Sequence, residues 1–137
     1  MKFYTRMLVV FLALMFGFSS MDSYAQQQPQ KMDLNVMAEE EADKLQKLLD
    51  LEDWQVFYVD STLKATYAAL QAEFDKLQKS KVTNAAIYQE AQDKCWDKIE
   101  ATYKKYFTEA QWALYLKNGA AKHQKQRAKR REKAKMQ

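Results

Sequence analysis

The residues able to make or break covalent bonds are few in this chain. One histidine, His123, and one cysteine, Cys95, are present. A hydrolytic or transfer site needs a nucleophile, a base and a group that orients the base. His123 lies in a basic segment with no apolar stripe to bury it, and Cys95 has no second histidine to serve as its base. Since no G-x-S-x-G, P-loop or glycine-rich phosphate cradle occurs, the sequence predicts a protein that is not an enzyme and has no cofactor.

The other ligand-type side chains have plainer explanations than a site. Glu39 and Asp43 are spaced i, i+4 and share a helix face, so a carboxylate-only metal site is conceivable. Zinc sites use clustered Cys, His or carboxylate ligands, and a solvated acidic face explains this pair better, so we expect no metal site. A single thiol in an exported protein forms no internal disulfide. Cys95 could join two chains, but a small helix-packing residue is the favoured interpretation.

The N-terminus has the pattern of a secretory signal peptide. Lys2 and Arg6 precede a short apolar run, residues 7–18. Ser23 and Ala25 then put small residues at positions −3 and −1 of a cleavage site. A membrane span needs about 20 apolar residues, so an uncleaved anchor is the minor alternative. No cysteine follows the run, which argues against a lipid anchor. We expect cleavage after Ala25 and a mature protein in the periplasm.

Charge is segregated along the mature chain. Residues 26–116 carry 11 basic and 16 acidic side chains, whereas residues 117–137 carry 9 basic and 1 acidic. Each Lys or Arg near an anionic surface contributes about 1 kcal/mol to binding. For an exported protein we expect anionic membrane headgroups or lipopolysaccharide phosphates as the partner, and no physiological nucleic acid; a solubilising extension is the alternative. The candidate polyanion-binding residues are Lys122, Lys125, Arg127, Lys129, Arg130, Arg131 and Lys133.

Composition and periodicity predict an all-α fold. The mature chain of 112 residues has one Pro and one Gly, too few for turn-rich β architectures, and is rich in helix-forming residues. Apolar side chains recur at steps of three and four in four segments. The expected helices span residues 33–49, residues 53–79, the stretch from a cap at Thr83 or Asn84 to residue 106, and a stretch starting at Thr108. The second of these would extend roughly 40 Å and, across a short link, lie antiparallel to the third.

The two long helices have the clearest apolar stripes. The stripe of the second helix is Val56, Val59, Leu63, Tyr67, Leu70, Phe74 and Leu77. The stripe of the third is Ile87, Ala91, Cys95, Ile99, Thr102 and Tyr106, with Trp96 and Tyr103 beside it. The expected organisation is a signal peptide in residues 1–25, a disordered leader in residues 26–32, a helical domain in residues 33–118 and a basic C-terminal tail in residues 119–137, exposed and either partly helical or disordered.

An elongated bundle of four helices from so short a chain would leave part of its apolar stripes uncovered. A second copy of the chain or the apolar groups of a client protein could cover them, so we expect a homodimer, a client-binding surface or both. The candidate client-binding residues are Trp54, Phe57, Tyr58, Trp112 and Tyr115. Aromatic residues at helical spacing are usually core, which is the alternative for each of them. Tyr58 is the best exposed candidate because it falls off the stripe of its helix.

A five-residue pattern occurs twice, each time at the start of an expected helix. Residues 51–55 read LEDWQ and residues 107–111 read FTEAQ, so each copy has a large apolar residue first, an acid third and Gln fifth. In the second copy Thr108 and Gln111 have the spacing of a capping box, and Phe107 is placed as a hydrophobic staple. The expected helix-capping and motif residues are Leu51, Gln55, Phe107, Thr108 and Gln111.

The paired pattern resembles the LTxxQ motif of the Spy/CpxP family of small exported helical proteins. The order of the motifs, the 56 residues between their starts and the mature length all match. Two positions depart from the motif: Glu52 stands in place of Thr, which is a poorer cap, and Phe107 stands in place of Leu.

The resemblance implies ATP-independent chaperoning of unfolded or misfolded envelope proteins during envelope stress. It also implies an elongated antiparallel dimer whose concave face binds clients, with the motif residues structural. Some members of the family restrain a sensor kinase and some bind zinc. The alternative function is an envelope structural or signalling adaptor, which would bind anionic lipid or a sensor kinase domain through its basic tail.

Overall fold

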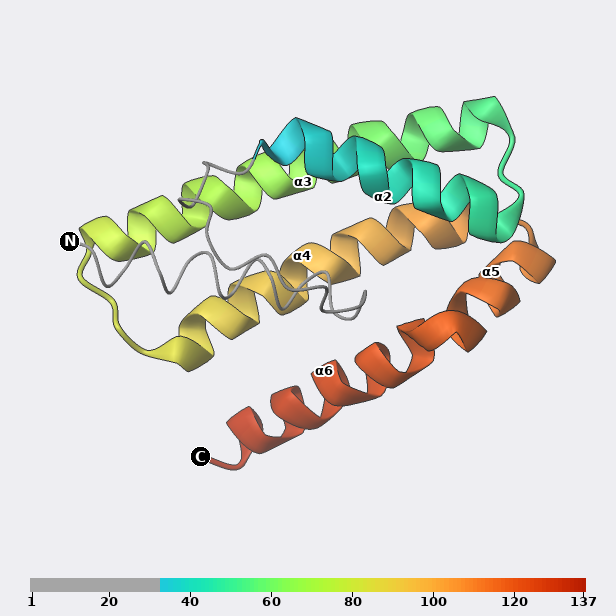
Figure 1. Cartoon of the computed structure of the whole chain (residues 1–137). Coiled ribbons are helices and arrows are strands. Elements are labelled where there is room, and N and C mark those ends of the chain that lie inside the picture. The colour runs from blue at the N-terminus through green and yellow to red at the C-terminus, as the bar shows by residue number, and fades with distance from the viewer. Residues whose placement is uncertain (1–32) are drawn as a thin grey trace, which may run out of the picture. The chain divides into compact units, whose positions relative to one another are not determined.

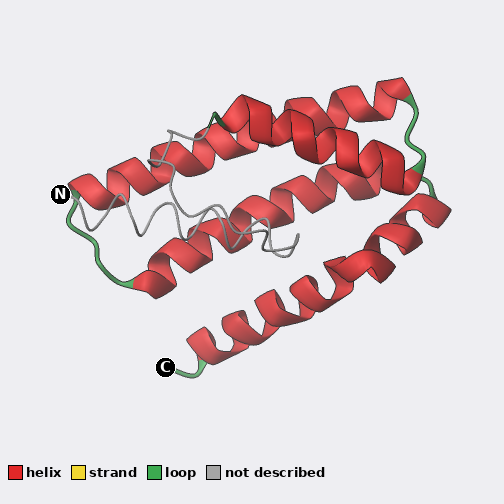
Figure 2. Ribbon diagram, in the orientation of Figure 1, coloured by secondary structure: helices red, strands yellow, loops and turns green. Residues whose placement is uncertain are grey.

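The computed structural model describes residues 33–137, and one compact unit spans Leu34–Gln137. The predicted signal peptide and leader lie outside the described residues. Within the described part all regular structure is helical, which confirms the all-α prediction (Figure 2). Three helices come first: α2 (Leu34–Leu49), α3 (Asp53–Lys79) and α4 (Ala85–Tyr106). The fourth is kinked and consists of α5 (Glu109–Tyr115), a π-helical turn (Leu116–Ala120) and α6 (Ala121–Lys135).

Helices α3 and α4 run antiparallel, as their short connection predicted, and α2 runs antiparallel to α3 (Figure 1). Helix α3 packs against both α2 and α4. Helix α6 returns along α4, since Arg127 pairs with Glu100 and Arg130 pairs with Asp93. None of the described helices is long and apolar enough to cross a membrane.

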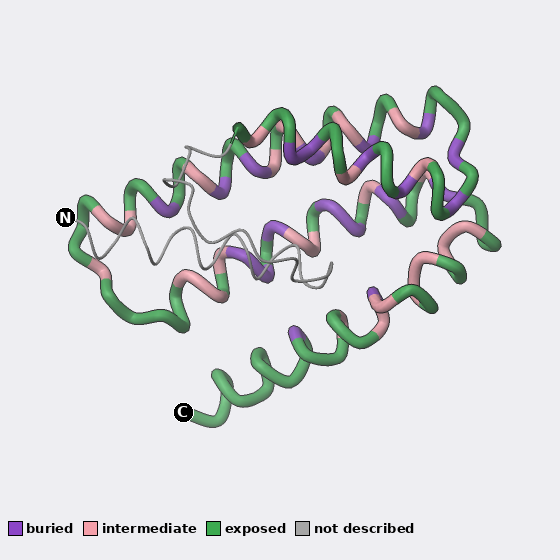
Figure 3. The backbone as a smooth tube through the Cα atoms, in the orientation of Figure 1, coloured by how far each residue is buried: buried purple, intermediate pink, exposed green. Residues whose placement is uncertain are grey.

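The core lies where α2, α3 and α4 face one another, and it follows the predicted stripe on α3 but only part of that on α4 (Figure 3). Most of the α3 stripe is buried, from Val59 to Phe74, whereas its ends Val56 and Leu77 are half-buried. On α4 the buried face is rotated from the prediction. Tyr103, expected beside the stripe, is 1% exposed, whereas Ile87 at the start of the stripe is 40% exposed.

Local signals set the helix ends. The Asn84 side chain caps α4 by accepting a hydrogen bond from the Ala86 N–H, at 3.0 Å. Helix α2 ends at Asp50, whose φ of 54° turns the chain, and the next N–H, that of Leu51, donates to the Gln46 carbonyl at 3.1 Å. Asp tolerates the left-handed region better than most residues because its short side chain can bond locally.

The basic segment is helical and most of its side chains are exposed, which matches one of the two expected alternatives, but it is also attached to the preceding helices. After the kink at Asn118 and Gly119, residues 121–135 form a regular helix that belongs to the same compact unit as the preceding helices. Arg127 in its middle is only 5% exposed. The expectation relied on apolar periodicity, whereas α6 is attached to α4 by charged side chains.

Candidate functional site

The two LTxxQ-like motifs meet in space. The side-chain amide of Gln55 donates to Oε1 of Gln111 at 2.7 Å, and the amide of Gln111 donates back to Oε1 of Gln55 at 3.2 Å. Each glutamine also donates to the carbonyl of the residue just before the other motif. Gln55 reaches the Tyr106 carbonyl at 2.9 Å, and Gln111 reaches the Asp50 carbonyl at 3.3 Å. We call this arrangement the glutamine junction.

Each glutamine also closes the entry of its own helix. Oε1 of Gln55 accepts from the Glu52 N–H at 2.9 Å, and Oε1 of Gln111 accepts from the Thr108 N–H at 2.9 Å. The Thr108 hydroxyl in turn accepts from the Gln111 N–H, which completes a capping box. Both oxygens and both amide groups of the junction are therefore used, and Gln55 is buried. The glutamine at the fifth motif position thus forms hydrogen bonds at the start of its own helix and at the start of the other motif's helix.

The leading motif residues serve packing. Leu51 and Phe107 are both buried. The Phe107 ring stacks on Tyr103 with ring centroids 4.9 Å apart, and it meets Tyr115 edge-on at 6.2 Å. At the first entry Glu52 occupies the cap position, and its carboxylate also accepts a hydrogen bond from the indole N–H of Trp54.

Four aromatic side chains gather at the first motif, three of them exposed and the fourth, Tyr106, half-buried. We call this group the aromatic surface: Trp54, Phe57, Tyr58 and Tyr106. The Tyr58 and Tyr106 rings stack with centroids 4.1 Å apart, so the group joins α3 to α4. The Trp54 ring meets both tyrosine rings edge-on, with its centroid 6.4 Å from that of Tyr58 and 6.3 Å from that of Tyr106. The centroids of the Phe57 and Tyr58 rings are 5.6 Å apart. Phe57 is 65% and Trp54 50% exposed.

The structure places the five candidate client-binding residues in two groups. Trp54, Phe57 and Tyr58 belong to the aromatic surface. Trp112 and Tyr115 are half-buried on α5, with their rings 5.4 Å apart, and the Tyr115 hydroxyl donates to Glu100 at 3.1 Å. Burial raises the pKa of Tyr115, and the nearby Glu100 carboxylate raises it further.

The seven candidate polyanion-binding residues also divide. The three arginines turn toward α4: Arg127 pairs with Glu100 and Asp97, Arg130 with Asp93, and Arg131 with Asp97. The four lysines are exposed: Lys122, Lys125, Lys129 and Lys133.

Helix α2 carries a partly buried carboxylate. The Glu41 side chain is 14% exposed, and Nζ of Lys44 lies 3.5 Å from it. Burial raises the pKa of Glu41, and Lys44 opposes the rise. Burial also raises the pKa of Tyr67 and Tyr103, and the charge of Glu41 contributes at both hydroxyls. The Tyr103 hydroxyl has no hydrogen-bond partner among the described residues.

The side chains first considered for bond-making chemistry lie apart. Cys95 is buried, its thiol 3.9 Å from the Thr66 carbonyl, and burial raises its pKa to about 12. His123 is exposed on α6. Glu39 is paired with Lys64 at 2.8 Å, and no cluster of three metal-ligating side chains occurs within residues 33–137.

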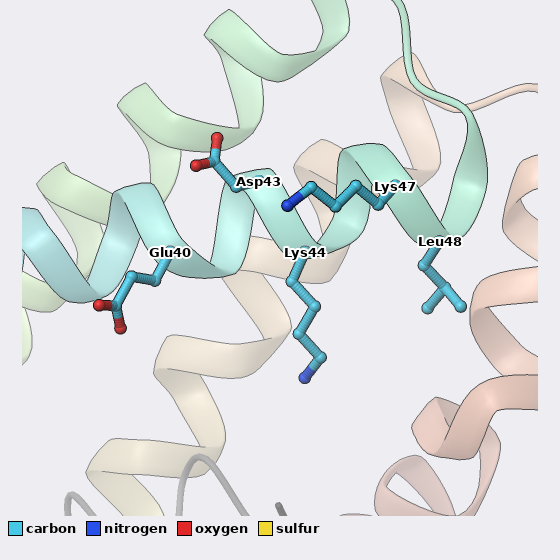
Figure 4. Close-up of a pocket in the computed structure, with 5 residues that line it drawn as sticks. All are labelled: Glu40, Asp43, Lys44, Lys47 and Leu48. Atoms are coloured by element: carbon cyan, nitrogen blue, oxygen red, sulfur yellow. The ribbon is translucent and has the colours of Figure 1, made fainter.

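A shallow depression of about 600 Å³ lies on the outer side of α2. It is lined by Glu40, Asp43, Lys44, Lys47 and Leu48, whose polar ends point in different directions (Figure 4). No two of these groups are brought together as a nucleophile and base would be, so the depression adds no candidate for catalysis.

Sequence reasoning missed the acidic partners of the arginines. Asp93, Asp97 and Glu100 follow one another at steps of four and three on α4, so they share a helix face, and Asp93 and Glu100 are buried. That spacing, matched to a basic helix expected to run antiparallel, was the available signal. Comparisons with protein-family models, with curated proteins and with solved structures give no match for this chain.

Proposed function

We propose that this protein is an exported, ATP-independent chaperone-like protein that reversibly captures unfolded polypeptide chains and catalyses no reaction. The observation that carries the proposal is the aromatic surface, where Trp54, Phe57 and Tyr58 are exposed side by side on the first two turns of α3. Contiguous exposed apolar groups are typical of interaction sites. The resemblance of the two motifs to the LTxxQ pattern supports the same interpretation.

The chemistry of this surface fits an unfolded chain better than one specific ligand. Aromatic rings give a large contact area with little loss of side-chain freedom, and the tyrosine hydroxyls keep part of the surface polar. Nζ of Lys105 lies 5.1 Å from the centre of the Tyr106 ring, so positive charge borders the aromatic groups. A segment with apolar and acidic side chains could therefore bind without a fixed sequence.

A homodimer is part of the proposal. A second copy could cover part of the exposed apolar area, leaving the remainder for clients. Light scattering on the mature protein, residues 26–137, measures the subunit number, and we expect two.

The test is an aggregation assay. A chemically denatured model protein is diluted into buffer with an equimolar amount of the mature protein, and turbidity is followed. We expect slower aggregation, weakened moderately by salt because charge assists the encounter. Phe57→Gln should lose most of this effect while keeping the helical circular dichroism signal, since Tyr58 is the one aromatic ring that Phe57 contacts within residues 33–137.

Ile87→Gln is the matched control, because Ile87 is exposed on α4 and lies outside the aromatic surface. It should protect the client as well as the unaltered protein does. The chaperone proposal fails if the unaltered protein does not slow aggregation of any unfolded test protein. Full protection by Phe57→Gln would instead show that the aromatic surface is not the binding site.

A further inference from the structure

Helix α6 separates its positive charges by residue type. All three of its arginines contact carboxylates of α4. Its five lysines are exposed and take part in no ion pair found within residues 33–137, and four of them lie on one side of the helix. We call these four the lysine stripe: Lys122, Lys125, Lys129 and Lys133. Their spacing of three, four and four residues aligns them along one side of the helix, away from Arg127 and Arg131.

The arginine contacts fix the orientation of the stripe. Arg127 is buried against Glu100, and Arg130 binds Asp93 through two hydrogen bonds, of 2.8 and 2.9 Å. Rotation of α6 about its axis would break these contacts. The lysines are therefore held outward, on a helix whose single acidic residue is Glu132.

The length of the lysine stripe favours an extended anionic surface over a compact anionic ligand. From Lys122 to Lys133 it extends about 16 Å along a regular helix. A flat anionic surface can meet all four lysines at once, whereas a compact ligand would meet one or two. Lysine is a hydrated point charge that needs no fixed partner geometry, unlike the arginines, which are paired with the carboxylates of α4. We propose that the lysine stripe docks the protein on anionic lipid headgroups, with α6 lying parallel to the membrane surface.

Attraction of this kind is electrostatic and adds up over the lysines. Each lysine near an anionic membrane strengthens binding about fivefold. No aromatic residue lies on α6 to insert among the lipids, so we expect adsorption without insertion and strong weakening by salt. The proposal is independent of client capture, because it uses a different helix and a different chemistry.

Vesicle co-sedimentation tests the proposal with residues 26–137, which include the whole compact unit Leu34–Gln137. The probes are vesicles of phosphatidylglycerol and phosphatidylcholine in equal parts, vesicles of phosphatidylcholine alone, and duplex DNA at equal phosphate concentration. We expect binding to the mixed vesicles only. Replacing the four stripe lysines by Gln should weaken that binding by about 600-fold if the four contributions add.

The matched control replaces four exposed lysines elsewhere by Gln, for the same change in net charge: Lys76, Lys79, Lys104 and Lys117. It should bind the mixed vesicles within a few-fold of the unaltered protein, and circular dichroism should show both variants folded. If both variants lose vesicle binding equally, net charge alone explains the binding and the proposed role of the lysine stripe is wrong. DNA binding as tight as vesicle binding would overturn the lipid assignment.

Discussion

Gln55 and Gln111, 56 residues apart, each donate a side-chain hydrogen bond to the other, at 2.7 and 3.2 Å. Each also bonds to the carbonyl that precedes the other motif. This approximate twofold arrangement gives a physical reason why the pentapeptide occurs twice. One glutamine alone would close its own helix entry and reach the carbonyl before the other motif. It would leave the carbonyl before its own motif without a partner, and its own amide group would lose the bond to the other glutamine.

Because Gln55 and Gln111 bond to each other, we expect their replacements to have coupled effects on the free energy of unfolding. Replacing Gln55 by Ala removes a buried side chain and leaves the Glu52 N–H, the Tyr106 carbonyl and the Gln111 amide without it, so we expect a loss of about 2–3 kcal/mol in the free energy of unfolding. Gln111→Ala should cost somewhat less because it is more exposed. The double variant should cost less than the sum of the two by about 1–2 kcal/mol. Urea unfolding followed by circular dichroism measures all three.

Gln71→Ala on α3 is the control for that cycle. Within the described part of the chain the Gln71 side chain bonds only to the exposed Asp75, so its loss should change stability by less than about 0.5 kcal/mol. Strictly additive costs for Gln55→Ala and Gln111→Ala would mean that the junction is not an energetic unit.

The features that the sequence predicted well depend on residues close together in the chain. The starts of α3, α4 and α5 came out as expected because Glu52, Asn84 and Thr108 cap these helices through bonds to residues three or fewer positions away. The pairing of Gln55 with Gln111 was not predictable in this way. Two capping glutamines look alike in sequence whether or not their helix entries meet.

The attachment of α6 shows a second limit of pattern reading. Arg127 and its neighbours carry no apolar signal, so a search for apolar stripes classifies residues 119–137 as a tail. The packing depends instead on a buried charge complemented by Glu100 on another helix. Complementarity of this kind becomes visible only when the antiparallel order of α4 and α6 is known.

The buried ion pair predicts the stability of that attachment. Arg127→Met would leave Glu100 buried without its guanidinium partner, and we expect a cost of about 3–5 kcal/mol or the release of α6 from α4. Hydrogen exchange of the α6 amides distinguishes the two, because release abolishes their protection without unfolding α3. Arg131→Met is the control: its side chain is 49% exposed, so about 0–1 kcal/mol should be lost.

A double variant tests whether the unpaired Glu100 carboxylate causes the loss of stability in Arg127→Met. Arg127→Met combined with Glu100→Leu removes both buried charges and should recover most of the lost stability. If the double variant is no more stable than Arg127→Met alone, an unpaired carboxylate is not the cause of the loss.

Glu41 predicts a dependence of stability on pH. Burial raises its pKa in the folded state above the unfolded value, so folding favours the protonated form and the ionised form costs stability. This cost is present at neutral pH and disappears as the pH falls through the folded pKa toward about 4. Glu41→Gln should therefore raise the unfolding midpoint at pH 7 and have a smaller effect in acid. Glu40→Gln, on an exposed neighbour, should show no such difference between the two pH values.

Gly119 predicts a backbone effect without a packing effect. Its φ of 115° is unfavourable for L side chains, yet a Cβ there would meet nothing within 4 Å. Gly119→Ala should therefore cost about 1–2 kcal/mol through strain alone, and Gly119→Asn should cost less because Asn tolerates positive φ. Thermal unfolding of both variants checks the order. Equal stability of Gly119→Ala and the unaltered protein would show that the kink can straighten without loss.

Cys95 predicts slow thiol chemistry in the folded protein. The thiol is buried and its pKa is raised to about 12, so very little thiolate exists at pH 8 and reagents reach it only when the helices open. Labelling by an aromatic disulfide reagent should be slow in buffer and fast in denaturant. An exposed thiol made by Ser61→Cys in a Cys95→Ala background should react rapidly in both conditions, since Ser61 lies on the surface of α3. Rapid labelling of native Cys95 would mean that α3 and α4 separate readily, and it would reopen the interpretation of this residue as a link between two chains.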